Sequence, residues 1–401
     1  MDYLDSIARV IYGAPELTAL DEQVLGEIQE IRDDLRFHLV SPRRWYGTLS
    51  RVMMARAVQA STSIEGYHST VDETAAIIDG EEPPGVDEDT QRAVSGYRDA
   101  MTYVLRLSAP SSPDRPMMDA SLLKSLHFIM VGHDLSSNPG QWRPGAVWVR
   151  DGVGNPVYEA PDRNVVEPLV DEFILSVNNS PVGPVSPVQE LVAAAMAHLN
   201  LTLIHPFSDG NGRMARCIQS FVLARADGAI SPTFGSIESY LGRKTAGYYA
   251  ALTNTAAGAW SPQRSARPWM EFCLTAHYHQ AEALRRRIDR FEALWDRCEQ
   301  TAIRCHLADR TIDALMQSAR GSSMNRSRYI RIVRSASGEQ ISDAMATRDL
   351  AAMVAAGLLE PVGEKRGRHY LPSESLRTLE QAIRAMQPAR PVIDPYGTST
   401  P

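Results

Sequence analysis

Cysteine is scarce in this chain, and the cysteines present do not form a framework. The four are Cys217, Cys273, Cys298 and Cys305, with no CxxC pair and no zinc-type spacing of histidine and cysteine around them. This argues against a disulfide-stapled domain and against a zinc-binding module. We expect buried thiols in a reduced, intracellular protein.

Long hydrophobic runs and a basic leader are also absent. No apolar run reaches the roughly 18 residues needed to span a membrane. The first ten residues, MDYLDSIARV, carry acids where a secretory signal would carry bases. We therefore expect a soluble, cytoplasmic protein with no membrane partner.

The chain lacks an excess of positive charge. Its net charge of -7 argues against nucleic-acid binding by the whole chain, so any basic surface must be local. The balance of 44% hydrophobic and 22% charged residues is that of an ordinary globular protein. A length of 401 residues predicts two or three domains.

Apolar residues recur at helical spacing nearly throughout the chain, as in residues 17–37, which predicts a mainly α protein. Residues 146–160, AVWVRDGVGNPVYEA, differ because two apolar runs flank Asp-Gly and Gly-Asn pairs, which predicts a β-hairpin. The Pro-rich end, QPARPVIDPYGTSTP, is typical of a flexible tail.

The segment richest in chemistry lies between two predicted helices at residues 205–216, HPFSDGNGRMAR. Gly210 and Gly212 allow a sharp turn with exposed amides, and the helix that follows adds its dipole, so the turn favours an anion. Arg213 and Arg216 at this helix start oppose the dipole unless an anion such as a polyphosphate lies there.

Two side chains of the same segment add reactive groups. Asp209 supplies a hard oxygen ligand suited to magnesium that bridges phosphates. His205 can take up a proton near neutral pH. Each residue alone is common in structural positions, but the combination is not easily explained by structure.

This segment resembles the signature of the Fic family, HPFxx[D/E]GNGRxxR, with every defined position present. The resemblance implies a Fic-fold helical bundle that transfers AMP from ATP, with Mg²⁺, to a Ser, Thr or Tyr hydroxyl of a target protein. It implies that His205 is the general base and that Asp209 is the Mg²⁺ ligand. Asn211 and the amides of Gly210 and Gly212 would form an anion hole, and Arg213 and Arg216 would bind the β- and γ-phosphates. Phe207 would anchor the loop. Related Doc kinase-type toxins have lysine where Gly212 stands, so glycine favours nucleotidyl transfer.

Further segments resemble the family more loosely. Residues 146–160 follow PGQWR and correspond to the flap on which the target docks as an added strand. Tyr248 and Tyr249 resemble a tyrosine pair near the adenine, although a core position is an equal alternative for one of them. Ala256 stands near the place of a base-binding asparagine in some relatives, which leaves the nucleotide preference open.

The run STSIEG at residues 61–66 matches the inhibitory motif [S/T]xxxE[G/N] of Fic proteins. The resemblance implies a class II arrangement, in which an N-terminal helix carries the inhibitory residue Glu65. Glu65 would pair with Arg216, because a carboxylate competes strongly with a phosphate for a guanidinium group.

Residues 306–372 resemble a winged helix-turn-helix, with helices near 307–319 and 345–356 and a middle segment at 325–334. The wing, EPVGEKRGRHYL, carries the basic residues Lys365, Arg366, Arg368 and His369. These residues could contact DNA phosphates, yet 10 basic against 7 acidic residues is a small local excess for a DNA binder. Dimerisation or target binding is the alternative.

The predicted division is an N-terminal helical region with the inhibitory helix (1–110), a Fic catalytic core (111–285), a connecting helix (286–305), a winged-helix domain (306–375) and a flexible tail (376–401). Two alternatives to an AMP transferase stay open. One is an enzyme that uses another nucleotide or removes AMP. The other is a DNA-binding regulator whose Fic core senses a nucleotide. The resemblance also implies a homodimer.

Overall fold

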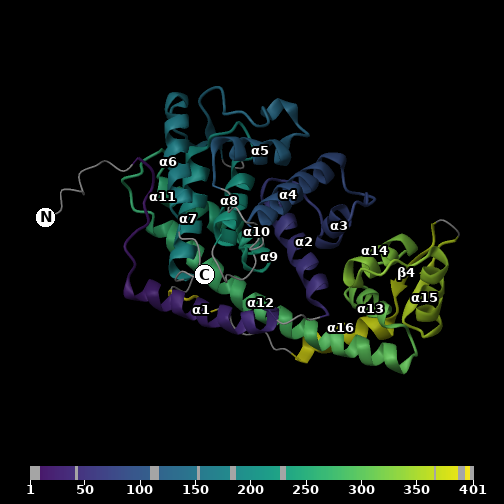
Figure 1. The fold of residues 1–401 in the computed structure, drawn as a ribbon. Coiled ribbons are helices and arrows are strands. Elements are labelled where there is room, and N and C mark those ends of the chain that lie inside the picture. Colours follow the sequence, from purple (N-terminus) through teal and green to yellow (C-terminus); the bar gives the residue numbers. More distant parts are fainter. Residues whose placement is uncertain are drawn as a thin grey trace. The chain divides into compact units, whose positions relative to one another are not determined.

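The computed structural model describes residues 10–40, 44–108, 117–150, 154–180, 187–225, 232–364, 367–386 and 393–397. In these residues the chain is mainly helical, with two small two-stranded sheets, which confirms the predicted mainly α fold class (Figure 1). None of the described helices is long and apolar enough to cross a membrane.

The chain divides into two compact units. The first comprises Met1–Asp34, Met53–Glu282 and Ile393–Pro401, and the second comprises Leu35–Val52 and Ala283–Val392. Helices α1 (Ala19–Val40), α2 (Tyr46–Ile64) and α12 (Arg267–Arg304) contribute residues to both units. The domain boundaries expected from the sequence stay a prediction.

The first unit is centred on α7 (Pro187–Ile204) and α8 (Asn211–Arg225), which pack side by side (Figure 1). Its other elements are α3 (Val71–Ile78), α4 (Glu88–Leu107), α5 (Ala120–Val131), η1 (Leu135–Ser137), β1 (Trp148–Arg150), β2 (Pro156–Glu159), η2 (Arg163–Val165), α6 (Val166–Asn178), α9 (Pro232–Gly235), α10 (Glu238–Arg243) and α11 (Thr245–Ala256).

Local sequence explains where several of these helices begin and end. Thr70 and Glu73 form a capping box that starts α3, and Asp87 and Asp119 cap α4 and α5 through their carboxylates. Helix α2 is followed by Gly66, whose φ of 88° is the left-handed conformation that commonly ends a helix.

Helix α8 is buried on nearly every face. Helices in such positions are normally apolar all round, but α8 buries Arg213, Arg216 and Arg225. Buried charges are costly unless they are paired. Packing alone therefore does not account for the buried arginines of this helix.

The second unit follows the order of elements expected for residues 306–372. A short 3-10 helix and three α-helices precede a hairpin and a last helix, namely η3 (Asp309–Thr311), α13 (Ile312–Ala319), α14 (Arg326–Ser337), α15 (Asp343–Ala355), β3 (Leu359–Val362), β4 (His369–Pro372) and α16 (Glu374–Met386). Strands β3 and β4 are antiparallel, and Met324 pairs with Tyr370 beside them. Buried Asp349 joins the helices, because it accepts hydrogen bonds from Arg310 and Tyr329.

The prediction of a flexible tail at residues 376–401 is wrong for residues 376–386, which are helical. Helix α16 occupies Glu374–Met386, with Leu376 and Ile383 buried. In the wing, Lys365 and Arg366 lie outside the described residues, whereas Arg368 is exposed and His369 is half-buried. The designation as a winged helix stays a prediction, as do the DNA and homodimer partners.

Candidate active site

The loop that joins α7 to α8 is held by its own residues. Asn211 closes it, because its side-chain oxygen accepts from the Phe207 amide at 3.0 Å and its side-chain nitrogen donates to the Phe207 carbonyl at 2.9 Å. The Phe207 ring is fully buried. Asn211 therefore holds the shape of the loop, and the Phe207 ring packs in the core beneath it.

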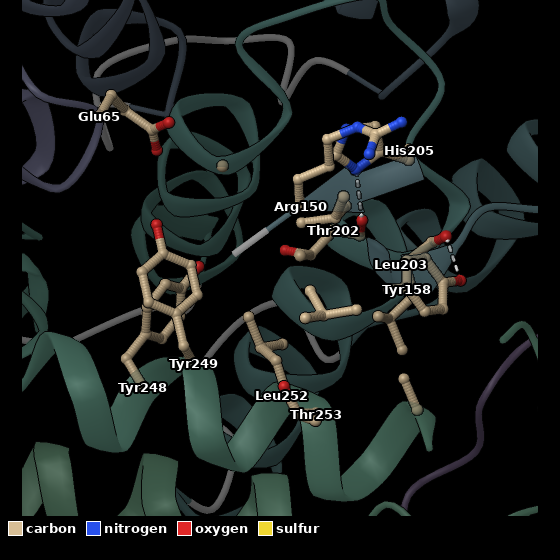
Figure 2. A pocket seen from close by; sticks show the side chains of 14 residues that line it. Glu65, Arg150, Tyr158, Thr202, Leu203, His205, Tyr248, Tyr249, Leu252 and Thr253 are labelled. Carbon is tan, nitrogen blue, oxygen red and sulfur yellow. Dashed lines mark hydrogen bonds between the residues drawn. The ribbon is translucent and has the colours of Figure 1, made fainter. Parts of the chain in front are cut away.

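His205 stands at the end of α7 with a φ of 52°, an uncommon backbone conformation for a residue other than glycine. Its Nδ1 donates to the Thr202 carbonyl at 3.1 Å, as Figure 2 shows. Because a carbonyl can only accept, this bond places the proton on Nδ1 and leaves Nε2 as an acceptor. Burial lowers the pKa of His205, against opposing effects of Thr202 and two carboxylates. The side chain is thus neutral near pH 7 and equipped to act as a base.

The start of α8 presents backbone amides with no intrahelical acceptor. Gly210 turns into the helix with a φ of 75°, a conformation that favours glycine. A Cβ atom on Gly212 would lie 2.5 Å from Oε1 of Glu65 and 3.2 Å from Nη1 of Arg216. The space above Gly212 is therefore already filled by two charged groups.

Arg213 and Arg216 are buried beneath this helix start, each with a side chain only 1% exposed. Arg213 donates through Nη2 to Oδ2 of Asp209 at 2.8 Å and lies over the Tyr67 ring. Its Nε and Nη1, and Nη1 of Arg216, have no hydrogen-bond partner among the described residues. Three unpaired buried donors at a helix N-terminus indicate a site for an anion.

Glu65 lies on this anion site. Its Oε1 accepts from Nη2 of Arg216 at 2.6 Å. Ser61 holds Arg216 from the same helix turn, because its side-chain oxygen accepts from Nε at 2.7 Å and its carbonyl from Nη2 at 3.1 Å. Burial alone would lower the pKa of Arg216, but the Glu65 carboxylate, together with Tyr248 and Tyr97, outweighs burial and the pKa is raised. Arg216 is thus held as a charged partner of Glu65.

A pocket of about 550 Å³ opens beside these residues (Figure 2). In Figure 2, Glu65 and the two tyrosines lie on one side of the pocket, and His205 and Arg150 lie on the other. The residues that line it come from α7, α8, α11, the β1–β2 hairpin and the end of α2, namely Glu65, Val149, Arg150, Val157, Tyr158, Thr202, Leu203, His205, Gly212, Tyr248, Tyr249, Leu252, Thr253 and Ala256.

The two tyrosines of α11 differ in exposure. Tyr248 is buried, and its hydroxyl donates to Nε2 of His198 at 3.0 Å, while Nδ1 of His198 donates to Gln219 at 2.6 Å. Burial lowers the pKa of His198 to about 3, so the ring stays neutral and can accept from Tyr248. Tyr249 is 45% exposed and faces the pocket. Tyr249 is therefore the better placed of the pair to contact a nucleotide base.

The hairpin predicted at residues 146–160 is present as β1 and β2, although residues 151–153 lie outside the described residues. The strands are antiparallel, with Trp148 opposite Glu159 and Val149 opposite Tyr158. The Tyr158 hydroxyl donates to the Leu203 carbonyl at 2.6 Å, which fixes the hairpin to the end of α7 beside the pocket (Figure 2).

Sequence reasoning missed three residues that support the site. Ser61 holds Arg216, and His198 holds Tyr248. Arg143 is fully buried, and its Nε donates to the His205 carbonyl at 2.8 Å. Its position in the run PGQWR was the available signal. Ser61 had a signal as the first position of the STSIEG motif, although the motif did not indicate its contact with Arg216. His198 carried none, because its partners are distant in sequence.

Residues 117–223 match the family described as Fic/DOC. This part of the chain is a Fic domain. It contains the loop from His205 to Arg216 and the β1–β2 hairpin, whereas Glu65, Tyr248 and Tyr249 lie outside it.

Known proteins resemble more of the chain than the Fic domain alone. A curated relative from Nematostella vectensis, named protein adenylyltransferase Fic, is 28% identical over 53% of this chain and 47% of its own length. The Caenorhabditis elegans protein adenylyltransferase fic-1 is 27% identical over 59% of this chain and 43% of its own length. The chain thus spans less than half of either relative.

A solved structure extends the likeness of fold beyond the Fic domain. The crystal structure of a Fic family protein from Desulfovibrio desulfuricans aligns over 90% of this chain and 99% of its own, with a TM-score of 0.54 and 21% identity. At this identity the comparison shows a shared fold.

Proposed function

We infer that this protein is a nucleotidyltransferase that transfers AMP from ATP to a hydroxyl of a target protein. The observation that carries this proposal is the meeting of His205, Asp209 and the unpaired nitrogens of two buried arginines at the start of α8. The names of the curated relatives support the same reaction.

In the proposed reaction, Nε2 of His205 takes the proton of the target hydroxyl. The hydroxyl oxygen attacks the α-phosphorus of ATP, the bond from that phosphorus to the bridging oxygen breaks, and pyrophosphate leaves. The amides at the start of α8 and the Arg213 guanidinium would oppose the charge on the phosphates. Positioning and electrostatic stabilisation then supply most of the catalysis.

Magnesium would be held by Asp209. The side chain is 52% exposed, and only one of its oxygens pairs with Arg213. Among the described residues, no group of three His, Cys, Asp or Glu could hold a metal ion. A single carboxylate fits Mg²⁺, which is usually bound by one or two carboxylates together with phosphates and water, and which would neutralise phosphate charge.

The base of the nucleotide would lie against Tyr249, Leu252 and Ala256 in the pocket. Stacking on an aromatic ring accepts any base. Since Ala256 offers no hydrogen bond to the base edge, the preference for ATP over other nucleoside triphosphates would depend on the remaining lining residues. This is why another nucleotide donor stays a candidate.

Glu65 would inhibit the enzyme in its present position. Its carboxylate pairs with Arg216 above Gly212, where a phosphate would otherwise bind. A target segment would dock on the hairpin beside His205. Glu159 of β2 already pairs with the segment at Gly258, so β1 offers the unpaired edge among the described residues.

The test is the intact mass of three purified full-length proteins after incubation with MgATP: wild type, Glu65→Gly, and Glu65→Gly combined with His205→Ala. We expect an AMP-sized adduct on the single variant alone. Transfer of label from α-labelled but not γ-labelled ATP identifies the group as AMP. Equal adducts on the single and double variants would remove His205 as the base, and equal adducts on wild type and Glu65→Gly would remove the inhibitory function of Glu65.

If no protein is labelled, the assay is repeated with GTP, CTP and UTP, and with an AMP-modified protein as the substrate for removal. If all of these assays fail and the protein is retained on DNA in a salt-sensitive way, the result would favour the alternative of a DNA-binding regulator whose Fic core senses a nucleotide.

A further inference from the structure

His127 lies beneath the loop of the site, on α5, and makes three contacts, two with this loop and one with Gly140. Its Nε2 is 3.0 Å from the Asp209 carbonyl, and its Nδ1 is 2.9 Å from the Gly140 amide. The ring stacks flat on Phe207, with centroids 3.8 Å apart and an interplanar angle of 6°. The side chain is fully buried.

The two ring nitrogens of His127 have opposite duties. The Gly140 amide can only donate, so Nδ1 must be bare. The Asp209 carbonyl can only accept, so Nε2 must carry the proton. The partners thus permit one tautomer, the opposite of that of His205, whose Nδ1 carries the proton. A ring with both nitrogens protonated could not accept from the Gly140 amide, so it could not connect the segment at Gly140 to the loop at Asp209.

The bond to Asp209 has a stereochemical consequence for the start of α8. The Asp209 carbonyl and the Gly210 N–H belong to one planar trans peptide, so they point in opposite directions. Since the carbonyl is drawn to His127, the N–H faces away from α5. His127 also fills the space behind the turn, because a Cβ on Gly210 would lie 3.0 Å from Val131 and 3.5 Å from Nε2 of His127.

We propose that His127 is a positioning residue, which fixes the peptide between Asp209 and Gly210 and so aims the Gly210 amide at a bound phosphate. It touches neither substrate nor metal and acts through the loop. The proposal deepens the proposed function and rests on it, because the phosphate is taken to be that of the nucleotide.

Two substitutions, made in the Glu65→Gly background, separate the hydrogen bond of His127 to Asp209 from its hydrogen bond to Gly140. In His127→Gln the side-chain amide nitrogen can reach the position of Nε2 and donate to Asp209. In His127→Asn the shorter side chain can only reach the position of Nδ1 and accept from Gly140. Leu169→Ala, in the buried face of α6, is the control for loss of stability without contact to the loop.

Calorimetric binding of MgATP is the first measurement. We expect His127→Asn to weaken binding roughly tenfold, about the worth of one hydrogen bond to a charged group. His127→Gln should rescue most of this loss, and Leu169→Ala should bind like the parent. Equal binding by the Asn variant and the parent, or equal losses in the Asn and Gln variants, would overturn the proposal and leave the proposed function intact.

The second measurement needs no nucleotide. In ¹⁵N spectra at pH 7.5, His127 should be protonated at Nε2 alone, and the Gly210 amide signal should shift in His127→Asn more than in His127→Gln. A proton on Nδ1, or an unmoved Gly210 signal, would overturn the positioning function. If the Glu65→Gly parent binds no MgATP, the proposed function fails. These spectra alone then show whether His127 positions the Gly210 amide.

Discussion

At the scale of single residues, the site depends on charges that the fold leaves incompletely paired. Arg213 and Arg216 are buried, yet three of their nitrogens have no partner among the described residues. A buried donor without a partner costs roughly 1–3 kcal/mol. Such a cost is tolerated where a ligand relieves it, and Glu65 relieves only part of it for Arg216.

The pH dependence of the proposed reaction follows from His205. Burial lowers the pKa of this side chain, and a base works only when it is unprotonated. The acid limb of kcat/KM should therefore lie below pH 6.5, the ordinary value for histidine. Removal of Glu65, whose charge raises the pKa of His205, should move the limb lower still.

The measurement is the rate of modification by Glu65→Gly between pH 5 and pH 8, with Mg²⁺ in excess. The Glu65→Gly and His205→Ala double variant gives the background. An acid limb at or above pH 6.5 would contradict the prediction.

The predicted site residues that the structure brings together are mostly neighbours in the chain. From His205 to Arg216, the turn, the helix start and the basic side chains follow each other, so their spacing alone brings them together. The position of Tyr248 was harder to predict, because its hydrogen-bond partner His198 is fifty positions away. Its likeness to a family pair indicated a place near the base, whereas exposure favours Tyr249.

At the scale of elements, the β1–β2 hairpin is too small to be stable by itself. Whether the hairpin is stably folded therefore depends on its attachment to the rest of the unit. Tyr158 provides this attachment through the Leu203 carbonyl, at the end of α7 just before His205. Turn residues predicted the hairpin, but only the fold could show what it is fastened to.

Tyr158→Phe should loosen the hairpin. The substitution removes a buried hydrogen bond of 2.6 Å and leaves the Leu203 carbonyl without this partner, at a cost of about 1 kcal/mol. Amide hydrogen exchange in β1 and β2 should become several-fold faster. Tyr103→Phe, at an exposed position of α4, is the matched control. Unchanged exchange in the hairpin would show that Tyr158 does not anchor it.

Helix α16 shows how an element can be missed. Because the end of the chain is rich in proline, a flexible tail was predicted from residue 376 onwards. Leu376, Leu379 and Ile383 nevertheless recur at helical spacing. The signal was present but short. Its apolar face gains stability only from tertiary packing, which the pattern alone does not reveal.

At the scale of the whole molecule, the chain returns to its first unit near its C-terminus. Tyr396, in the segment Ile393–Gly397, donates its hydroxyl to Oδ1 of buried Asp21 at 2.8 Å. Oδ2 of Asp21 accepts from the Thr18 amide at 2.7 Å and from Arg267 at 2.5 Å. One carboxylate thus joins the start of α1, the start of α12 and the end of the chain.

Stability in acid should depend on Asp21. Burial alone would raise its pKa, but the hydrogen bonds from Thr18, Arg267 and Tyr396 outweigh it and lower the pKa to about 2. The folded state then binds the proton less readily than the unfolded state, whose carboxyl has a pKa near 3.8. The contribution of Asp21 to stability is complete above about pH 4 and is lost as the pH falls through 2.

Asp21→Asn should lower the free energy of unfolding by roughly 2 kcal/mol at pH 7, the scale of a hydrogen bond to a charged group. The difference from wild type should shrink as the pH falls from 4 towards 2, because the wild-type carboxyl then becomes neutral as well. Thermal unfolding of both proteins across this range measures the difference. Glu22→Gln, an exposed neighbour in α1, should show no comparable change. A difference that persists undiminished at pH 2 would mean that Asp21 stabilises the unit through its shape and not through its charge.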